Sequence, residues 1–220
     1  MGLGKLHDHS RQGHAGSTIN HPRAYDVLAA VGFAGRRREV FTRLAALSGA
    51  RPGDRVLDVG CGTGYLTRVL APLIGSAGRV VGVDPSPQMV EHARRLAPDN
   101  CSYVVGAGQA LDLADGSFDV VVTSLAVHHM PEEERGAAVR EMFRVLRPGG
   151  LLLVAEFRRP ANRLLAGLLT ALGGPAHRHS PRELLGDLIP RAGFHVEDEG
   201  ELPPLLFYVR ARRPSISLTS

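Results

Sequence analysis

Three glycines at alternate positions, Gly60, Gly62 and Gly64, follow an apolar run that contains one acidic side chain, Asp58. Glycine-rich turns of this kind let backbone N–H groups approach a nucleotide-like cofactor closely. A second carboxylate, Asp84, ends the next apolar run along the chain. A carboxylate in that place can accept hydrogen bonds from the hydroxyls of an adenosine ribose. The pattern predicts a nucleoside-binding crevice.

The residues around the glycines discriminate among three classes of cofactor. The dinucleotide fingerprint G-x-G-x-x-G needs a third glycine where this chain has Tyr65. Asp58 would repel a pyrophosphate, whereas it would attract a cation. A triphosphate-binding P-loop needs a lysine, and Lys5 is the only lysine in the chain. A ligand with an adenosine and a positive centre fits best, which indicates S-adenosylmethionine.

Four segments resemble those of the class I S-adenosylmethionine-dependent methyltransferases, near the ubiquinone/menaquinone-biosynthesis type and its small-molecule relatives. They are VLDVGCGTGYLT (56–67), VVGVDPSPQMVEHAR (80–94), DGSFDVVVTSLAVHHM (115–130) and REMFRVLRPGGLLLVAEF (140–157). The resemblance implies an enzyme that transfers a methyl group from S-adenosylmethionine to a small organic acceptor by in-line displacement. The acceptor is expected to be largely apolar, with transfer to O, C or N left open.

The resemblance also implies a cofactor contact for each of a set of residues. From the methionine part through the ribose and adenine to the floor beside the methyl group, they are Asp58, Gly60, Cys61, Gly62, Asp84, Pro85, Met89, Ala107, Gly108, Gln109, Ser124 and Leu125. Relatives usually have Gly-Asp-Ala after the third strand, and that Asp bonds the adenine amino group. Here the loop reads Gly106-Ala107-Gly108. Backbone groups of Ala107 and Gly108, or the side chain of Gln109, would have to substitute.

Candidate catalytic residues follow the fourth and fifth predicted strands. His128 and His129 come directly after a strand, at the edge where ligands of such sheets bind, and either touch the acceptor, act as a base or are structural. Glu156, at the end of the strand 151–157, is a candidate for orienting an acceptor amine or hydroxyl. The histidines of the N-terminal segment match no metal-ligand spacing, and we expect no metal.

The predicted elements alternate in a way that positions these residues together. Strands are expected at 55–60, 79–84, 101–107, 118–127 and 151–157, with helices between them. This alternation is typical of a doubly wound α/β sheet with mostly parallel strands, a Rossmann-like fold, and the resemblance makes it seven-stranded. Only Pro203-Pro204 join the last two strands, so these must form an antiparallel C-terminal hairpin.

We expect residues 1–21 to be a flexible tail and residues 22–220 to form one domain. N-terminal helices (22–48) and a helical insertion after strand five (158–192) would cap the site. Tyr25, Leu165 and Leu168 would then be walls of the acceptor pocket. The apolar face that carries the two leucines can equally pack on the sheet or pair two subunits as a homodimer.

The composition of the chain limits the classes of partner that we expect. The net charge is +4, but the arginines are dispersed and no aromatic stacking motif accompanies them, which argues against a nucleic-acid partner. No signal peptide or membrane-spanning run is apparent, and two cysteines make no disulfide framework, so we expect a cytoplasmic protein without stable membrane insertion. The alternatives kept open are a cofactor-binding protein without methylating activity, an RNA methyltransferase, and a lipid or quinone methylase.

Overall fold

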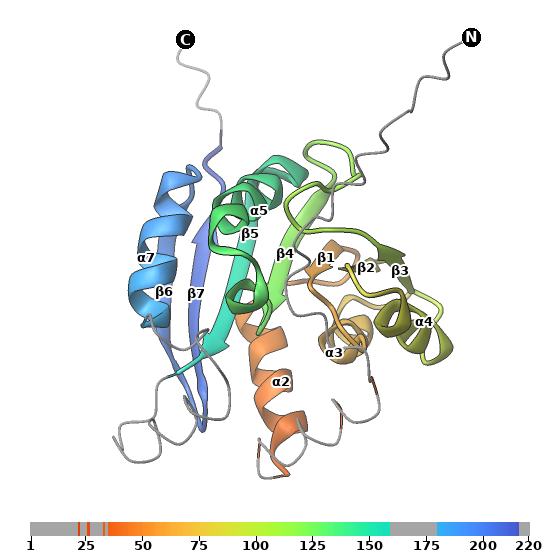
Figure 1. The fold of residues 1–220 in the computed structure, drawn as a ribbon. Helices are drawn as coiled ribbons and strands as arrows, with labels where there is room; N and C mark the ends of the chain where they lie inside the picture. The colour runs from red at the N-terminus through yellow and green to blue at the C-terminus, as the bar shows by residue number, and fades with distance from the viewer. Residues whose placement is uncertain (1–21, 23–25, 27–32, 34, 159–179, 216–220) are drawn as a thin grey trace, which may run out of the picture.

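The computed structural model describes residues 22, 26, 33, 35–158 and 180–215. Seven strands of this part of the chain form one sheet in the order β3-β2-β1-β4-β5-β7-β6 (Figure 1). Their bounds are β1 Arg55–Val59, β2 Arg79–Asp84, β3 Cys101–Val105, β4 Phe118–Ser124, β5 Leu146–Phe157, β6 His195–Leu202 and β7 Leu206–Arg212. Strands β1 to β5 pair in parallel, and β7 pairs antiparallel with both β5 and β6. The predicted fold class and the C-terminal hairpin are confirmed.

Helices cover both faces of the sheet. Their bounds are α2 Arg37–Leu47, α3 Tyr65–Ile74, α4 Pro87–Arg95, α5 Glu132–Val145 and α7 Pro181–Arg191. Helices α2 and α3 share one buried apolar cluster with the sheet, and α5 and α7 share another on the opposite face. Helix α4 packs on β2 and β3 at the end of the sheet. This two-sided cover explains why β1 and β4 are buried along most of their length, on both faces of the sheet.

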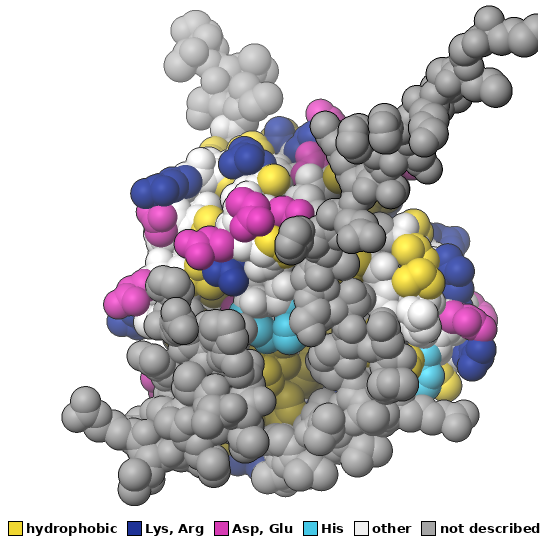
Figure 2. Space-filling model, in the orientation of Figure 1, with side chains coloured by type: hydrophobic (Ala, Val, Ile, Leu, Met, Phe, Trp, Pro, Cys, Tyr) yellow, Lys and Arg dark blue, Asp and Glu magenta, His cyan; other side chains and the backbone are white. Residues whose placement is uncertain are grey.

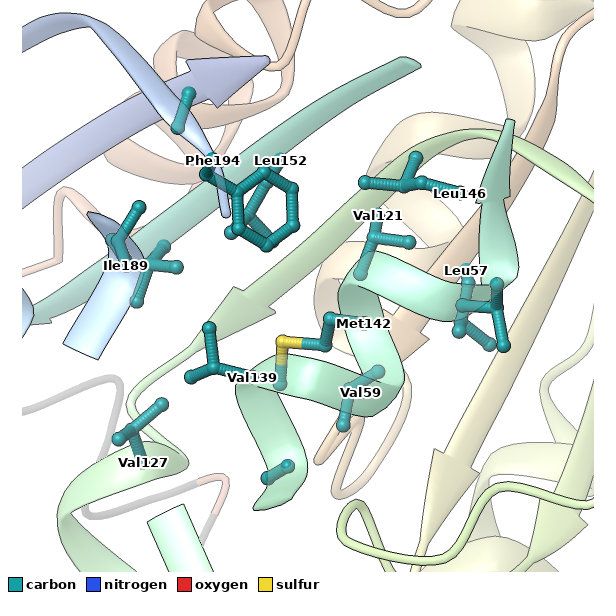
Figure 3. Packing of buried hydrophobic residues seen from close by; sticks show 14 of the residues in the cluster. Leu57, Val59, Val121, Val127, Val139, Met142, Leu146, Leu152, Ile189 and Phe194 are labelled. Atoms are coloured by element: carbon teal, nitrogen blue, oxygen red, sulfur yellow. The ribbon is translucent and has the colours of Figure 1, made fainter. Parts of the chain in front are cut away.

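Helix α5 is held to the sheet by a dense apolar contact. Val139 and Met142 of α5 belong to the same cluster of buried side chains as Leu57, Val59 and Val121 of β1 and β4 (Figure 3). All five side chains are at most 1% exposed. Burial of each such side chain stabilises the fold by roughly 1.5–3 kcal/mol, so the two central strands that carry the site's loops are firmly fixed.

Four predicted strand boundaries are wrong, and the two larger differences have a local reason. The strand expected at 118–127 ends at Ser124, because Leu125 takes a left-handed backbone conformation (φ 58°) and a 3-10 turn, Val127–His129, follows. Strand β5 begins at Leu146 and not at residue 151, because Leu146 pairs with Phe118 before an irregularity in the register. Strands β1 and β3 also end one or two residues earlier than predicted.

The two predicted capping segments are only partly within the described residues. Helix α2 is the second expected N-terminal helix, and it lies over the same face as α3. The C-terminal part of 158–192 forms α7, which packs against α5 and the hairpin, so this part is a layer on the sheet. Residues 1–21 and 159–179 lie outside the described part, as do Tyr25, Leu165 and Leu168. Within the described residues, no helix is long and apolar enough to cross a membrane.

Candidate functional site

The glycine-rich loop between β1 and α3 is shaped by close packing. Gly60 has φ 73°, and a Cβ atom there would lie 2.3 Å from the Cβ of Ala126. Any larger residue would therefore have to displace the loop after β4. The backbone N–H groups of Gly60 and Cys61 donate to the carbonyl of Val83, at 2.8 and 3.0 Å, which ties the loop to β2.

Gly62 differs from Gly60 because the position that a Cβ atom would take at Gly62 lies in open space. A Cβ at Gly62 would meet no protein atom within 4 Å among the described residues, although its φ of 52° favours glycine. Its N–H donates to the Asp84 carboxylate at 2.8 Å. The loop thus leaves a hollow that a ligand can fill.

Asp84 stands at the end of β2, beside this hollow. Its two carboxylate oxygens accept hydrogen bonds from the N–H of Gly62 and, at 2.9 Å, from the N–H of Ser86. Each carboxylate oxygen can accept more than one hydrogen bond, so the group retains capacity for a ligand's hydroxyls. Burial raises the pKa of Asp84, and the two backbone N–H groups oppose that rise. Both donors fix the orientation of the carboxylate before any ligand arrives.

Asp58 lies behind this wall. Its side chain is 1% exposed, and it accepts a hydrogen bond of 2.6 Å from the hydroxyl of Thr67 in α3. Burial raises the pKa of Asp58 to about 7. Asp58 is not among the residues that line the neighbouring cavity. The cofactor contact that the resemblance implies for Asp58 stays a prediction; from behind the wall, its position allows an influence on a ligand through the electric field.

A cavity of about 280 Å³ opens over the carboxyl ends of β1, β2, β3 and β4. This edge, where the strand order turns from β1 to β4, is where open α/β sheets bind ligands. Every residue of the implied cofactor set except Asp58 lines it. The sequence argument missed a further set of lining residues: Arg37, Phe41, Thr63, Tyr65, Leu66, Ser86, Ala126, Met130, Pro131 and Glu134.

Arg37 is a buried cation on the cavity wall. It is 8% exposed, its guanidinium lies 3.9 Å from the centre of the Tyr65 ring, and Nη1 donates to the Asp26 carboxylate at 2.9 Å. Its Nε has no hydrogen-bond partner among the described residues. The sequence contains a signal for this position, since Arg37, Val40 and Phe41 fall on one helical face, whereas the dispersed arginines as a group indicate a solvated surface.

The floor of the cavity carries backbone strain. Leu125 is the one residue other than glycine with positive φ in the described part of the chain, and its N–H donates to the carbonyl of Ala155 at 2.8 Å. A branched side chain in this conformation costs about 1 kcal/mol or more. The strain lies beside Ser124 at the predicted floor of the ligand site, so the fold holds this turn in place against its local preference.

The three candidate catalytic residues take different positions. Glu156 is 3% exposed, and its carboxylate accepts from the N–H of Val127 at 2.8 Å and lies 2.5 Å from Nδ1 of His128. The rings of His128 and His129 are 3.9 Å apart between centroids. Of the three, only His129 lines the cavity. Glu156 and His128 therefore support the turn that presents His129. Figure 2 shows histidine side chains beside a hydrophobic patch near the middle of this face.

The cysteine thiols are not reactive groups. Burial raises the pKa of Cys61 well above its usual value and that of Cys101 to about 11, so neither forms a thiolate near neutral pH. Both are free. Within the described residues, no cluster of three or more His, Cys, Asp or Glu side chains is arranged to hold a metal ion.

Comparisons with known proteins add an independent result. Residues 56–150 match the model of a family described as a methyltransferase domain. The ubiquinone/menaquinone biosynthesis C-methyltransferase UbiE of Ectopseudomonas mendocina (strain ymp) is 42% identical over 125 residues, 54% of this chain and 48% of that protein. UbiE of Shewanella sp. (strain ANA-3) is 37% identical over 146 residues, 64% of this chain and 57% of that protein. The chain thus spans about half the length of the curated relatives it matches.

A solved structure agrees with the fold over a longer range. The crystal structure of a SAM dependent methyltransferase from Aquifex aeolicus superposes with a TM-score of 0.71 at 22% identity, covering 88% of this chain and 98% of that one. At this identity the similarity concerns the fold alone. The aligned 88% of the chain is a larger part than residues 56–150, which match the family model.

Proposed function

We propose that the chain, whose residues 56–150 match a methyltransferase domain, is a class I S-adenosylmethionine-dependent enzyme that methylates a small, largely apolar organic acceptor. One observation carries the proposal: a single cavity unites the Gly60–Gly62 loop, Asp84, the 107–109 loop and Leu125 from four successive strand ends. The buried cation Arg37 lies on the same wall. S-adenosylmethionine has a part that suits each of these groups.

The chain's own residues fit the cofactor as follows. The hollow over Gly62 admits the methionine part, and Arg37 offers a guanidinium to its carboxylate. The Asp84 carboxylate accepts from the ribose hydroxyls, while Pro85 and Met89 provide apolar surface for the adenine. When bound, the cofactor supplies a methyl group on a positively charged sulfur.

The remaining work of the protein is alignment of the acceptor and exclusion of water. Ser124 and Leu125 form the floor, and His129 lies on the wall nearby, where it can take a proton from a hydroxyl acceptor. His128 and Glu156 would then be positioning residues, because their contacts hold the 127–129 turn. A hydroxyl or an electron-rich aromatic carbon, as in a phenol, a quinol or a polyketide-like compound, suits such a site. One relative described above is a ubiquinone/menaquinone biosynthesis C-methyltransferase.

Partners and location remain part of this proposal. We expect a small-molecule substrate, no nucleic acid and a cytoplasmic location. The arginines support this view, since many of them are engaged within the fold: Arg144 donates to the carbonyls of Leu111 and Leu113, and Arg213 to that of Leu146. Residues used in this way do not form a phosphate-binding surface.

A ligand-binding measurement followed by an activity screen tests the proposal. S-adenosylhomocysteine should raise the melting temperature, since a ligand at a hundred times its Kd adds about 2.7 kcal/mol of stability. NAD and ATP serve as comparison ligands. Methyl release is then measured on a panel of phenols, quinols and amines. Stabilisation by NAD alone would refute the cofactor assignment, and S-adenosylhomocysteine binding with no turnover on any acceptor class would favour the non-methylating alternative.

A further inference from the structure

Two polar side chains from distant parts of the chain meet on the cavity wall. Gln109 belongs to the loop after β3, and Glu134 belongs to the first turn of α5. The Nε2 of Gln109 donates to Oε2 of Glu134 at 2.7 Å. Both residues are partly exposed and both line the cavity. The loop residues 106–109 themselves include no acidic side chain, so the carboxylate at this point of the wall comes from α5.

The contact decides which way the Gln109 amide points. An ionised carboxylate only accepts hydrogen bonds, so the NH₂ end of the amide must face Glu134. The Gln109 carbonyl oxygen and the second N–H are then presented in a fixed order. A glutamine with this orientation offers one acceptor and one donor side by side, which is the complement of an adenine edge.

The cavity wall around Gln109 suits a base. Asp84, the proposed partner of the ribose, precedes α4, and Met89 of α4 lines the same cavity as Gln109. Gly108 packs closely, since a Cβ there would lie 3.1 Å from Val59 and 3.2 Å from Met130. The loop therefore cannot shift far, and Gln109 shares the cavity wall with the apolar side chains of Met89 and Met130.

We propose that Gln109 recognises the amino group and ring nitrogen of the cofactor's adenine, and that Glu134 is the positioning residue that fixes the Gln109 amide. This rests on the proposed cofactor. Hypoxanthine presents the reverse pattern, an oxygen acceptor and an N–H donor. To pair with it the amide would have to turn, which would put its carbonyl oxygen against the Glu134 carboxylate. The pair thus makes the site selective for adenine over hypoxanthine.

The test compares binding of S-adenosylhomocysteine and S-inosylhomocysteine by calorimetry. Wild-type protein is expected to favour the adenosyl ligand roughly 10- to 100-fold. In Glu134→Gln the amide at 134 can donate or accept, so Gln109 can turn, and the ratio should fall toward one, chiefly because the inosyl ligand binds more tightly. Glu133→Gln is the matched control: it removes a charge from the same helix turn at an exposed position, and the ratio should stay at the wild-type value.

A second variant, Gln109→Leu, tests the proposal even if Glu134→Gln does not fold. Gln109→Leu keeps the size of the side chain and removes the amide; it should lower adenosyl affinity about tenfold and also bring the ratio toward one. Melting temperatures without ligand show that each variant is folded. If wild-type protein binds neither ligand, the proposed function fails. If it binds the adenosyl ligand but Glu134→Gln and Gln109→Leu keep the full ratio, this inference is overturned while the cofactor assignment stands.

Discussion

The hydroxyl of Thr63 donates a hydrogen bond of 2.9 Å to the carboxylate of Asp26, 37 positions earlier in the chain. The same carboxylate accepts from Arg37, and its other oxygen lies 3.5 Å from Nε2 of His92 in α4. One side chain of the N-terminal segment thus contacts the glycine-rich loop, α2 and α4. Two residues of the cavity wall, Arg37 and Thr63, are thus held by a residue outside the motifs singled out in the sequence.

The Asp26 contacts predict a coupling between the N-terminal segment and ligand binding. Asp26→Asn should lower the free energy of unfolding by about 1–3 kcal/mol, because it removes the charge that balances the buried Arg37. Thr63→Val removes one contact and should cost about 1 kcal/mol. Both should weaken S-adenosylhomocysteine binding. Urea unfolding and calorimetry measure the two effects; unchanged affinity in Asp26→Asn would show that this contact is not coupled to the site.

The position of Arg37 on the cavity wall predicts that its substitution weakens ligands with a carboxylate more than ligands without one. Arg37→Met should weaken S-adenosylhomocysteine by roughly the 1.5–3 kcal/mol of a charged hydrogen bond, but leave 5′-methylthioadenosine, which has no carboxylate, nearly unaffected. Arg38→Met changes an exposed neighbour and serves as the control. Equal weakening of both ligands by Arg37→Met would mean that Arg37 shapes the wall and does not bind the carboxylate.

The two loop glycines predict opposite outcomes for the same substitution. Gly60→Ala should destabilise the protein by several kcal/mol, because its Cβ would overlap that of Ala126. Gly62→Ala should cost only about 1–2 kcal/mol for the left-handed backbone, yet it should reduce ligand affinity, since its methyl group enters the hollow. Thermal unfolding without ligand and calorimetry with ligand separate the two. A Gly62→Ala variant that binds normally would exclude the hollow as part of the site.

Asp58 predicts a pH dependence of stability. Its folded pKa of about 7 lies above the ordinary value of 3.8, so its protonated form is the one the fold favours. Stability relative to Asp58→Asn should therefore be greatest below about pH 4 and fall as pH rises to 7, by up to about 1.4 kcal/mol per pH unit. Denaturant titrations of both proteins from pH 4 to 8 measure this. A constant difference over that range would contradict the protonated form.

The contact between Glu156 and His128 predicts a loss of turnover without loss of the cofactor. Glu156→Gln keeps an acceptor for the N–H of Val127 but presents an amide to Nδ1 of His128, which changes the tautomer that the ring can adopt. The rate at which the enzyme methylates an acceptor should fall about 10- to 100-fold. The affinity for S-adenosylhomocysteine should stay within a few-fold of wild type. A matched His129→Asn variant tests the wall residue itself. Wild-type turnover in both would remove these residues from the mechanism.

Much of this protein was predictable from local sequence. The alternation of apolar strands and helices, the two-residue link at Pro203-Pro204 and the order of glycines and carboxylates led to the sheet, the hairpin and most of the cavity wall. These features are encoded locally, because strand ends, turns and caps depend on neighbouring residue types. The resemblance implied the cofactor residues, and each of them except Asp58 lines the cavity.

Tertiary structure alone decided which polar side chains face the cavity and which face the protein. Asp58 and Asp84 look equivalent in sequence, yet Thr67 holds the first behind the wall while backbone N–H groups turn the second toward it. The contact between Gln109 and Glu134 joins a loop and a helix 25 positions apart. Such contacts form only when separate elements pack against one sheet, because hydrogen-bond partners of a buried side chain are chosen by space and not by sequence distance.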